Sequence, residues 1–545
     1  MPRQPEPIPS AATAGLTLGW RPGRRLAGAA LALAITLLIA ALLVSLLIAG
    51  QTIPSRPGTT PDIAHLLRMS AIQAGTSTVL SVLVGLVLAW ALDRLRFPGR
   101  ALVVGMVSAA LVLPSLVVVS GLLAVLGRNG VINAILSPFG LSTGSAVFGF
   151  WGIVIAHVLL NGAFAARLFL DRLEAVPVSA LKLGRSLGLR PLTRLRVIDL
   201  PALLPSVPAI AATVFLVCFT SFAIVLVLGG GPSNQTFEVA IFEAVRLDFD
   251  LSGAVRLALI QLAACALVIV PATALAPAAT PYGRTTAFHW PEPWPLRLGQ
   301  IILLIALLAA YLGPLLAVLL RGTPAALVGL MGNPTFWRSL ATSLSIGAAS
   351  AVLSVAIAVG LGMARALWTG RPVIRLALAL PVFAYMVVPA VVLGLGFFLL
   401  ARQTGVAPST AAPAVLVLAN ALLALPFAFA ALGPGFTALL ASHGKLIRSL
   451  ALGGFAQWRL IEWPLLAPAL GYAAAVAFTF SLGDLGVIAL FGTADFTTLP
   501  WMMYRAFGSY RTQDAEALAA VLLALSILAF IAIPKLFGGL ARARA

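Results

Sequence analysis

Charged residues are scarce in this chain. They make up 9% of its 545 positions and hydrophobic residues make up 61%, whereas soluble globular domains carry about 25% charged residues. Such a composition excludes a soluble globular chain and predicts a polytopic membrane protein. Because the apolar runs are about 20 residues long, enough for one helix to cross the hydrocarbon core, we predict an all-α fold.

Cysteines and acidic residues are also few, and one nucleotide-binding motif is missing. Cys218 and Cys265 both lie in long apolar runs, so neither a disulfide framework nor a zinc site is expected. The 16 acidic residues form no catalytic cluster, and the sequence contains no GxxxxGK[ST] loop to hold the phosphates of ATP. We therefore predict no catalytic site, no metal site and no ATPase site in this chain, so it is not an enzyme.

Long apolar runs fill most of the sequence, and we predict about twelve transmembrane helices from them. They cover residues 26–50, 70–92, 101–126, 145–166, 202–229, 257–279, 298–320, 339–364, 376–401, 410–432, 467–492 and 517–534. The first run follows three arginines and is too long for a signal peptide. We expect it to be retained behind a cytoplasmic tail of residues 1–25.

The positive charge of the chain sets its orientation. Lys and Arg number 35 against 16 Asp and Glu, which gives a formal net charge of +19. With the N-terminus inside, most of these cations fall in the cytoplasmic segments, as the positive-inside rule requires. We therefore expect cytoplasmic N- and C-termini, contact with membrane lipid, and no nucleic-acid partner.

An internal repeat divides the chain into two halves. Lys182–Pro205 and Lys445–Pro468 are two copies of a similar polar segment at an offset of 263 residues, in which Asp199 aligns with Glu462. An even number of helices in each half gives both halves the same orientation. This predicts two parallel repeats of about six helices, related by an axis along the membrane normal.

We place the first half at 26–280, a cytoplasmic linker at 281–297 and the second half at 298–545. Each half carries one cytoplasmic polar segment before its fifth helix, at 167–201 and 433–466. An amphipathic segment presented twice with twofold symmetry suits a symmetric partner. It could equally lie on the lipid surface with its Arg side chains snorkelling, and the residues alone leave both hypotheses open.

These segments resemble the EAA-type loops that precede the penultimate helix of ABC importer permeases. The two copies read KLGRSLGLRPLTRLRVIDLP and KLIRSLALGGFAQWRLIEWP. They depart from the family pattern because Lys182 and Lys445 replace its Glu, its alanine pair is lost, and its Gly is kept as Gly188 but replaced by Ala451. The resemblance covers nearly the whole chain and implies the type I (MetI-like) permease architecture.

The same resemblance implies a permease subunit in the bacterial inner membrane that separate proteins drive. Two copies of a cytoplasmic ATPase subunit would dock on the polar segments and use the ATP, so this chain would bind no cofactor itself. A substrate-binding protein would rest on external loops around Gly230–Asp250 and Thr493–Asp514. The residues implied to couple the ATPase to the membrane helices are Arg185, Ser186, Leu187, Gly188, Leu189, Arg190, Arg448, Ser449, Leu450, Ala451, Leu452 and Gly453.

The substrate is implied by resemblance alone. Permeases with both halves in one chain are similar to those of thiamine and ferric-iron importers, and the stretches SLGDLGVIALFG and TLPWMMYRAFGSYR look most like the thiamine and thiamine diphosphate permeases. Ferric iron is the alternative, ahead of sulfate and putrescine. A secondary transporter of the twelve-helix kind is more distant, because such carriers have their longest cytoplasmic loop between helices six and seven.

Asp484 is the acidic residue that lies well inside a predicted span, where an Asp costs about 2.5–3.5 kcal/mol. It could stabilise a cationic substrate, or it could bond backbone groups that the flanking glycines leave free. Both hypotheses stay open. The first defines a candidate translocation path of Asp484, Ser221, Phe478 and Phe480.

His157 and Asn420 occupy equivalent positions in the fourth and tenth predicted spans. Polar side chains inside membrane helices commonly bond across to a neighbouring helix. We expect interhelical hydrogen bonds from both residues.

Overall fold

The computed structural model describes residues 21–53, 62–110, 113–142, 147–275, 288, 290, 292–368, 370–450 and 452–542. Within these ranges the chain is helical and contains no strand, as the composition predicts. Nearly all of the predicted tail 1–25 and much of the predicted linker 281–297 lie outside the described residues.

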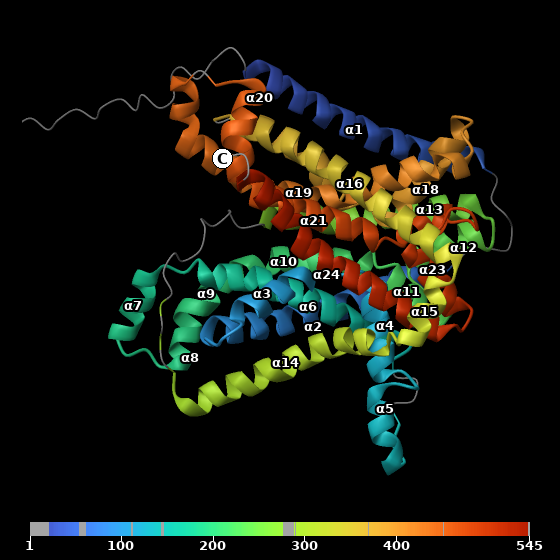
Figure 1. Cartoon of the computed structure of the whole chain (residues 1–545), viewed down its shortest axis with the longest axis horizontal. Coiled ribbons are helices and arrows are strands. Elements are labelled where there is room, and N and C mark those ends of the chain that lie inside the picture. The colour runs from blue at the N-terminus through green and yellow to red at the C-terminus, as the bar shows by residue number, and fades with distance from the viewer. Residues whose placement is uncertain are drawn as a thin grey trace, which may run out of the picture.

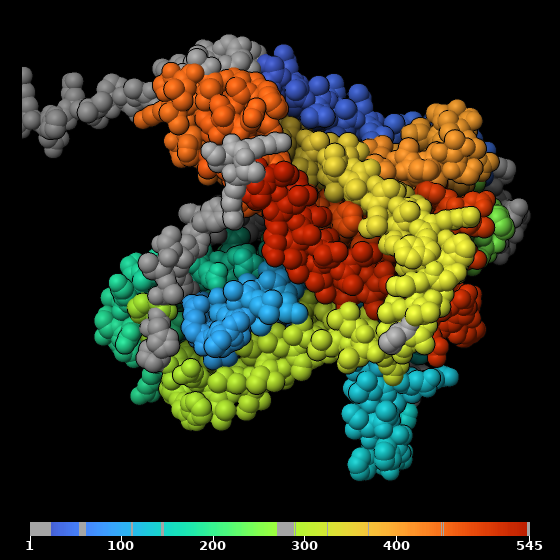
Figure 2. Space-filling model, viewed as in Figure 1, coloured from blue at the N-terminus to red at the C-terminus, as the bar shows by residue number. Residues whose placement is uncertain are grey.

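The helices of the first half match its predicted spans. Those that run unbroken are α1 (Arg21–Thr52), α2 (Ile63–Arg94), α6 (Phe150–Glu174) and α13 (Leu251–Leu275). The two divided spans consist of α3 (Arg100–Ala109) with α4 (Ser115–Leu126), and α10 (Val207–Phe219) with α11 (Ala223–Leu228). A short helix, α5 (Val131–Leu136), follows α4 and projects from the body (Figure 2).

The second half repeats this order. Its unbroken helices are α14 (Trp294–Arg321), α16 (Pro334–Leu367), α19 (Pro408–Ser449) and α24 (Thr512–Arg542). Its divided spans consist of α17 (Pro372–Ala384) with α18 (Ala390–Gln403), and α21 (Trp463–Leu482) with α22 (Gly486–Phe491). The short helix α15 (Pro324–Met331) joins α14 to α16.

Four predicted spans are right in place but are not single helices. In the described part of the chain, eleven helices are long and apolar enough to cross a membrane. The predicted span 376–401 is not among these eleven, because it is divided into the shorter helices α17 and α18. Pro114 and Pro389 stand at the start of α4 and α18, where proline disfavours helical conformation in the residue before it. The corresponding spans are broken in both halves, so the breaks belong to the repeat.

The first helix of each half packs on the opposite half. α1 lies along α16, α17 and α18, whereas α14 lies along α4 and α2. Figure 1 shows α1 and α14 on opposite sides of the body. A helix of each half therefore packs along the outside of the other half. The basic start of α1 reaches the polar segment of the second half.

Two short helices, α12 (Phe237–Arg246) and α23 (Leu499–Gly508), lie at one end of the body (Figure 1). The backbone N–H of Phe237 donates to Ser70 Oγ in α2 at 3.3 Å, and that of Leu499 donates to Ser343 Oγ in α16 at 2.8 Å. These bonds satisfy N–H groups that a helix start leaves without partners. Both halves are thus anchored in the same way at this end.

Candidate functional site

The first polar segment lies at the end of the body opposite α12 and α23 (Figure 1). It is folded as α7 (Val178–Ser186), α8 (Pro191–Arg194) and a π-helical turn, η3 (Leu195–Asp199). Pro177 stands before α7 and separates it from α6. Gly188 has a φ of +65°, a left-handed conformation that glycine adopts without steric cost, and this residue turns the chain from α7 toward α8.

The second polar segment starts differently. Leu440 stands where the first copy has Pro177, and α19 runs without a break from its membrane span to Ser449. Next come α20 (Gly454–Gln457) and the turn η6 (Trp458–Glu462), which repeats η3. Among the described residues of this segment, Gly454 has the left-handed backbone conformation, with a φ of +59°. The adjacent glycines Gly453 and Gly454 were the sequence feature that could have indicated this turn.

The predicted coupling residues lie largely on the surface. Arg185, Ser186, Leu187, Gly188 and Arg190 are exposed in the first copy, as are Ser449 and Leu450 in the second. Leu189, Leu452 and Gly453 are half-buried. Ala451 lies outside the described residues, and the backbone of Arg448 belongs to α19.

Both segments expose apolar side chains at matching positions. Leu187 is 68% exposed and its equivalent Leu450 is 58% exposed. The other exposed apolar pairs at the same offset are Leu183 with Leu446, Leu192 with Phe455, and Val197 with Leu460. Exposed basic residues accompany them, namely Lys182, Arg185, Arg196, Lys445 and Arg459. Apolar surface rimmed by charge is typical of a protein-binding face.

Two buried acids attach these segments to the membrane helices. Asp199 in η3 and its equivalent Glu462 in η6 are both buried. Asp199 forms an ion pair with Arg94 at the end of α2, whereas Glu462 pairs with Arg24 of α1 at 2.7 Å. Arg24 also donates to the carbonyl of Gly454 at 2.9 Å. The two acids therefore have the same place in the repeat but partners from different helices.

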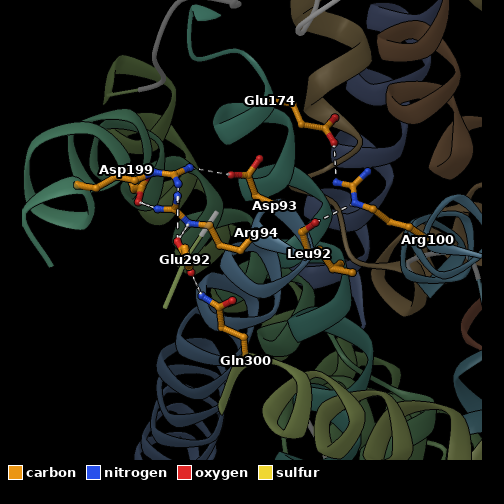
Figure 3. A network of polar contacts seen from close by, with 9 residues as sticks. Leu92, Asp93, Arg94, Arg100, Glu174, Asp199, Glu292 and Gln300 are labelled. Atoms are coloured by element: carbon orange, nitrogen blue, oxygen red, sulfur yellow. Dashed lines mark hydrogen bonds and ion pairs between the residues drawn. The ribbon is translucent and has the colours of Figure 1, made fainter. Parts of the chain in front are cut away.

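Glu292, just before α14, extends the ion network of the first segment. Its carboxylate lies 3.5 Å from Arg94 Nε and 3.6 Å from Arg194 Nη1. Figure 3 shows Arg94 between Asp199 and Glu292. Trp290 adds its ring, 4.3 Å from the Arg194 guanidinium. The entry to the second half is thus bonded to the polar segment of the first half.

Sequence reasoning missed this network, although the matching acids were visible. The repeat pairs Asp199 with Glu462 and Arg194 with Gln457, and Gln457 bonds Glu462 within its own segment. The partners of the two acids could not be inferred from the repeat, because they come from positions that are not equivalent: Arg94 ends α2 of the same half, whereas Arg24 lies at the start of α1, which packs on the other half.

A cavity of about 300 Å³ lies where the divided helices of the two halves meet. Its lining includes Pro114 and Pro389 at the starts of α4 and α18, and residues 220–222 and 483–485 between the divided helices. Equivalent breaks from both halves therefore surround one central space. Unwound backbone inside a membrane protein is tolerated where it lines such a cavity.

The candidate path residues are only partly brought together. Asp484, Ser221 and Phe480 line the cavity, whereas Phe478 packs against Gly347 of α16. Both oxygens of the Asp484 carboxylate accept backbone hydrogen bonds, from Val487 N–H at 3.2 Å and Ile488 N–H at 3.4 Å. Asp484 thus bonds the freed start of α22 and faces the cavity as well.

The interhelical bonds expected of His157 and Asn420 are confirmed. His157 Nδ1 in α6 lies 2.6 Å from Gln73 Nε2 in α2, and Asn420 Nδ2 in α19 donates to Ser481 Oγ in α21 at 3.0 Å. Both residues also line the cavity.

At the opposite end from the polar segments, the predicted external loops contain α12 and α23. Glu238 of α12 is buried and accepts hydrogen bonds from Gln261 Nε2 at 2.9 Å and from the backbone N–H of Val391 at 3.3 Å. This carboxylate ties α12 of the first half to α18 of the second. Burial and the nearby Asp248 carboxylate raise the pKa of Glu243 on the same helix.

Comparison with known proteins places the chain among transport permeases. The family described as "Binding-protein-dependent transport system inner membrane component" matches residues 81–282. "Thiamine transport system permease protein ThiP" of Salmonella typhimurium is 37% identical over 484 residues, which are 87% of this chain and 89% of that protein. The proteins of the same name from Brucella melitensis and Haemophilus influenzae are also similar. The first is 37% identical over 464 residues, 84% and 85% of the two chains; the second is 32% identical over 514 residues, 93% and 95%.

Proposed function

The chain belongs to the binding-protein-dependent transport permeases, inner-membrane subunits of ABC importers, and we propose that the solute it imports is thiamine or thiamine diphosphate. The relatives named as thiamine permeases align with both halves of the chain. Their similarity thus extends over the central cavity as well as the two polar segments.

We propose further that a dimer of ATPase subunits docks on the two polar segments. The observation that carries this is the set of matched exposed apolar side chains, which includes Leu187 and Leu450. A lipid-facing role would not require the same apolar positions in both copies, but a symmetric partner would. The exposed lysines and arginines beside them suit an acidic rim on that partner.

Movement of the ATPase subunits reaches the membrane helices through the buried ion pairs. Asp199 passes motion of the first segment to α2 through Arg94, and Glu462 passes motion of the second to α1 through Arg24. Because α1 packs on α16, α17 and α18, pulling on it shifts the second half as a unit. Alternating access then follows as rocking of one half against the other.

A soluble substrate-binding protein would deliver the solute at the other end of the body. The loops that carry α12 and α23 offer it a surface on each half. Glu238 bonds α12 to the start of α18, so contact at this end can reach the cavity directly.

Reconstituted transport tests the proposal. Proteoliposomes that hold the permease with its ATPase and binding protein are given labelled thiamine, with ferric iron as the alternative substrate. We expect thiamine uptake that requires ATP and the binding protein. Uptake of ferric iron in place of thiamine would contradict the substrate, and uptake driven by an ion gradient without ATP would contradict the mechanism.

A further inference from the structure

The central cavity is symmetric in its backbone but not in its side chains. Equivalent breaks of the two halves surround it, yet Asp484 of the second half stands opposite Ser221 of the first at the same place in the repeat. Phe480 likewise corresponds to Val217. The shared breaks explain why a cavity exists, and the unequal side chains give one of its walls a distinct chemistry.

That wall combines aromatic surface with an acid. The rings of Phe427 and Phe480 are stacked, with centroids 4.9 Å apart and an interplanar angle of 23°, and both residues line the cavity beside Asp484. An aromatic face attracts a cation, most strongly where water is excluded. The Asp484 carboxylate accepts hydrogen bonds from the backbone of residues 486–488 and from the Asn420 side chain, and it brings a negative charge to the lining of the cavity.

Three buried polar atoms of cavity-lining residues have no hydrogen-bond partner among the described residues. They are His157 Nε2, Asn420 Oδ1 and Tyr385 Oη, from side chains that are 1%, 3% and 2% exposed. Leaving such a group without a partner costs about 1–3 kcal/mol. Their gathering around one cavity points to a bound group that pairs with them.

The existing bonds define which of these atoms donate and which accept. Gln73 Nε2 can only donate, so His157 Nδ1 accepts and Nε2 carries the hydrogen. Asn420 Nδ2 carries two hydrogens: it donates to Ser481 Oγ and also bonds the Asp484 carboxylate, which leaves Oδ1 as the free acceptor. A ligand that satisfies both needs an acceptor on its side toward the first half and a donor on its side toward the second.

We propose that this cavity is a transient binding site for a planar heteroaromatic cation during translocation. This proposal rests on the proposed function and says where in the membrane the solute binds. Asp484 and the Phe427–Phe480 stack hold the cationic ring. Asn420 Oδ1 and His157 Nε2 pair with donor and acceptor atoms on the ring edges. A volume of about 300 Å³ is at the lower end of the range for small-molecule sites, so one such ligand fills it.

Equilibrium binding to the purified permease–ATPase complex tests this site. The probes are thiamine and its analogue with a neutral thiophene in place of the thiazolium ring. Asp484→Asn keeps an oxygen that can cap α22 but removes the charge, and Asp495→Asn removes an equal charge from an exposed position. Phe480→Leu is compared with Phe478→Leu, whose ring packs against Gly347.

We expect Asp484→Asn to weaken thiamine binding by about 30-fold and Phe480→Leu by about 5-fold, with both control variants within about 2-fold of the unaltered complex. Binding of the neutral analogue should change little in any variant. Equal thiamine binding by the unaltered and Asp484→Asn complexes, or an equal loss for the neutral analogue, would overturn the site. Thiamine import into proteoliposomes is scored separately: its failure with the unaltered complex contradicts the proposed function, whatever the binding result.

Discussion

Single residues decide how firmly the polar segments are attached to the membrane helices. Asp199 and Arg94 form an ion pair in which both side chains are 3% exposed. Loss of Asp199 would leave the buried Arg94 with only its longer contact to Glu292 at 3.5 Å, which is costly. Removal of Arg94 as well relieves that cost, because Glu292 keeps its contact to Arg194 at 3.6 Å. The pair therefore fixes the position of the first polar segment relative to α2, even if it adds little net free energy of folding.

The first prediction is a double-mutant comparison at this pair. Asp199→Leu alone should lower the free energy of unfolding by about 3–5 kcal/mol, and adding Arg94→Leu should restore part of that loss. Thermal unfolding in detergent can be followed by the reaction of a thiol dye with Cys218 and Cys265, which are buried and free. If the double variant loses as much unfolding free energy as the two single variants lose together, the account is refuted.

Gly188 and Gly454 give a second prediction. Both have positive φ, and a Cβ would meet no atom within 4 Å at either position. Substitution by Ala should therefore cost backbone strain only, about 1 kcal/mol. Hydrogen exchange of the neighbouring amides should become about 5-fold faster.

Gly444→Ala is the matched control, because this residue is inside α19 and a Cβ there also meets nothing within 4 Å. Helix propensity favours Ala at such a position. If Gly188→Ala leaves local exchange as slow as Gly444→Ala does, the left-handed turn does not constrain the segment.

Among elements, the spans could be predicted from the sequence but their breaks and their partners could not. Runs of about 20 apolar residues locate a helix, and each predicted run holds helix in the structure. The breaks at Pro114 and Pro389 had a signal in the proline itself, but proline also occurs inside α19 and α24 without ending them. Tertiary packing decides between these outcomes.

The candidate site shows the same limit. Repetition identified both polar segments, and burial cost drew attention to Asp484. The crossing of α1 and α14 to opposite halves had no sequence signal, because an apolar helix face fits either half equally well. Phe478 and Phe480 lie two residues apart in α21 and so point to different sides of that helix, but the sequence did not indicate which side faces the cavity.

The crossing of α1 yields a prediction at this scale. Arg24→Ala removes the bonds from α1 to Glu462 and Gly454, so α20 and η6 should open more readily. Hydrogen exchange over residues 454–462 should rise by about 5-fold or more. Residues 191–199 serve as the internal control, because the first segment is held by Arg94. An equal rise in both segments would show general loosening and contradict the assigned link.

For the whole molecule, two docking segments on one chain mean that a partner dimer is held at two points. Binding at the second point is then intramolecular and adds avidity. Leu187→Asp or Leu450→Asp alone should therefore weaken retention of the ATPase about 10-fold, and the double variant about 100-fold or more. Co-purification measures this, with the exposed Leu247→Asp at the opposite end as control. A double variant that retains the ATPase like the control would exclude these segments as its docking site.

Photo-crosslinking tests the central claim most directly. A photoreactive amino acid is placed at position 187 or at position 450 of the permease in membranes that hold the complete transporter, and the crosslinked products are identified by mass spectrometry. The account predicts that each position crosslinks to one ATPase subunit. Crosslinks to lipid alone, or to the substrate-binding protein, would contradict it.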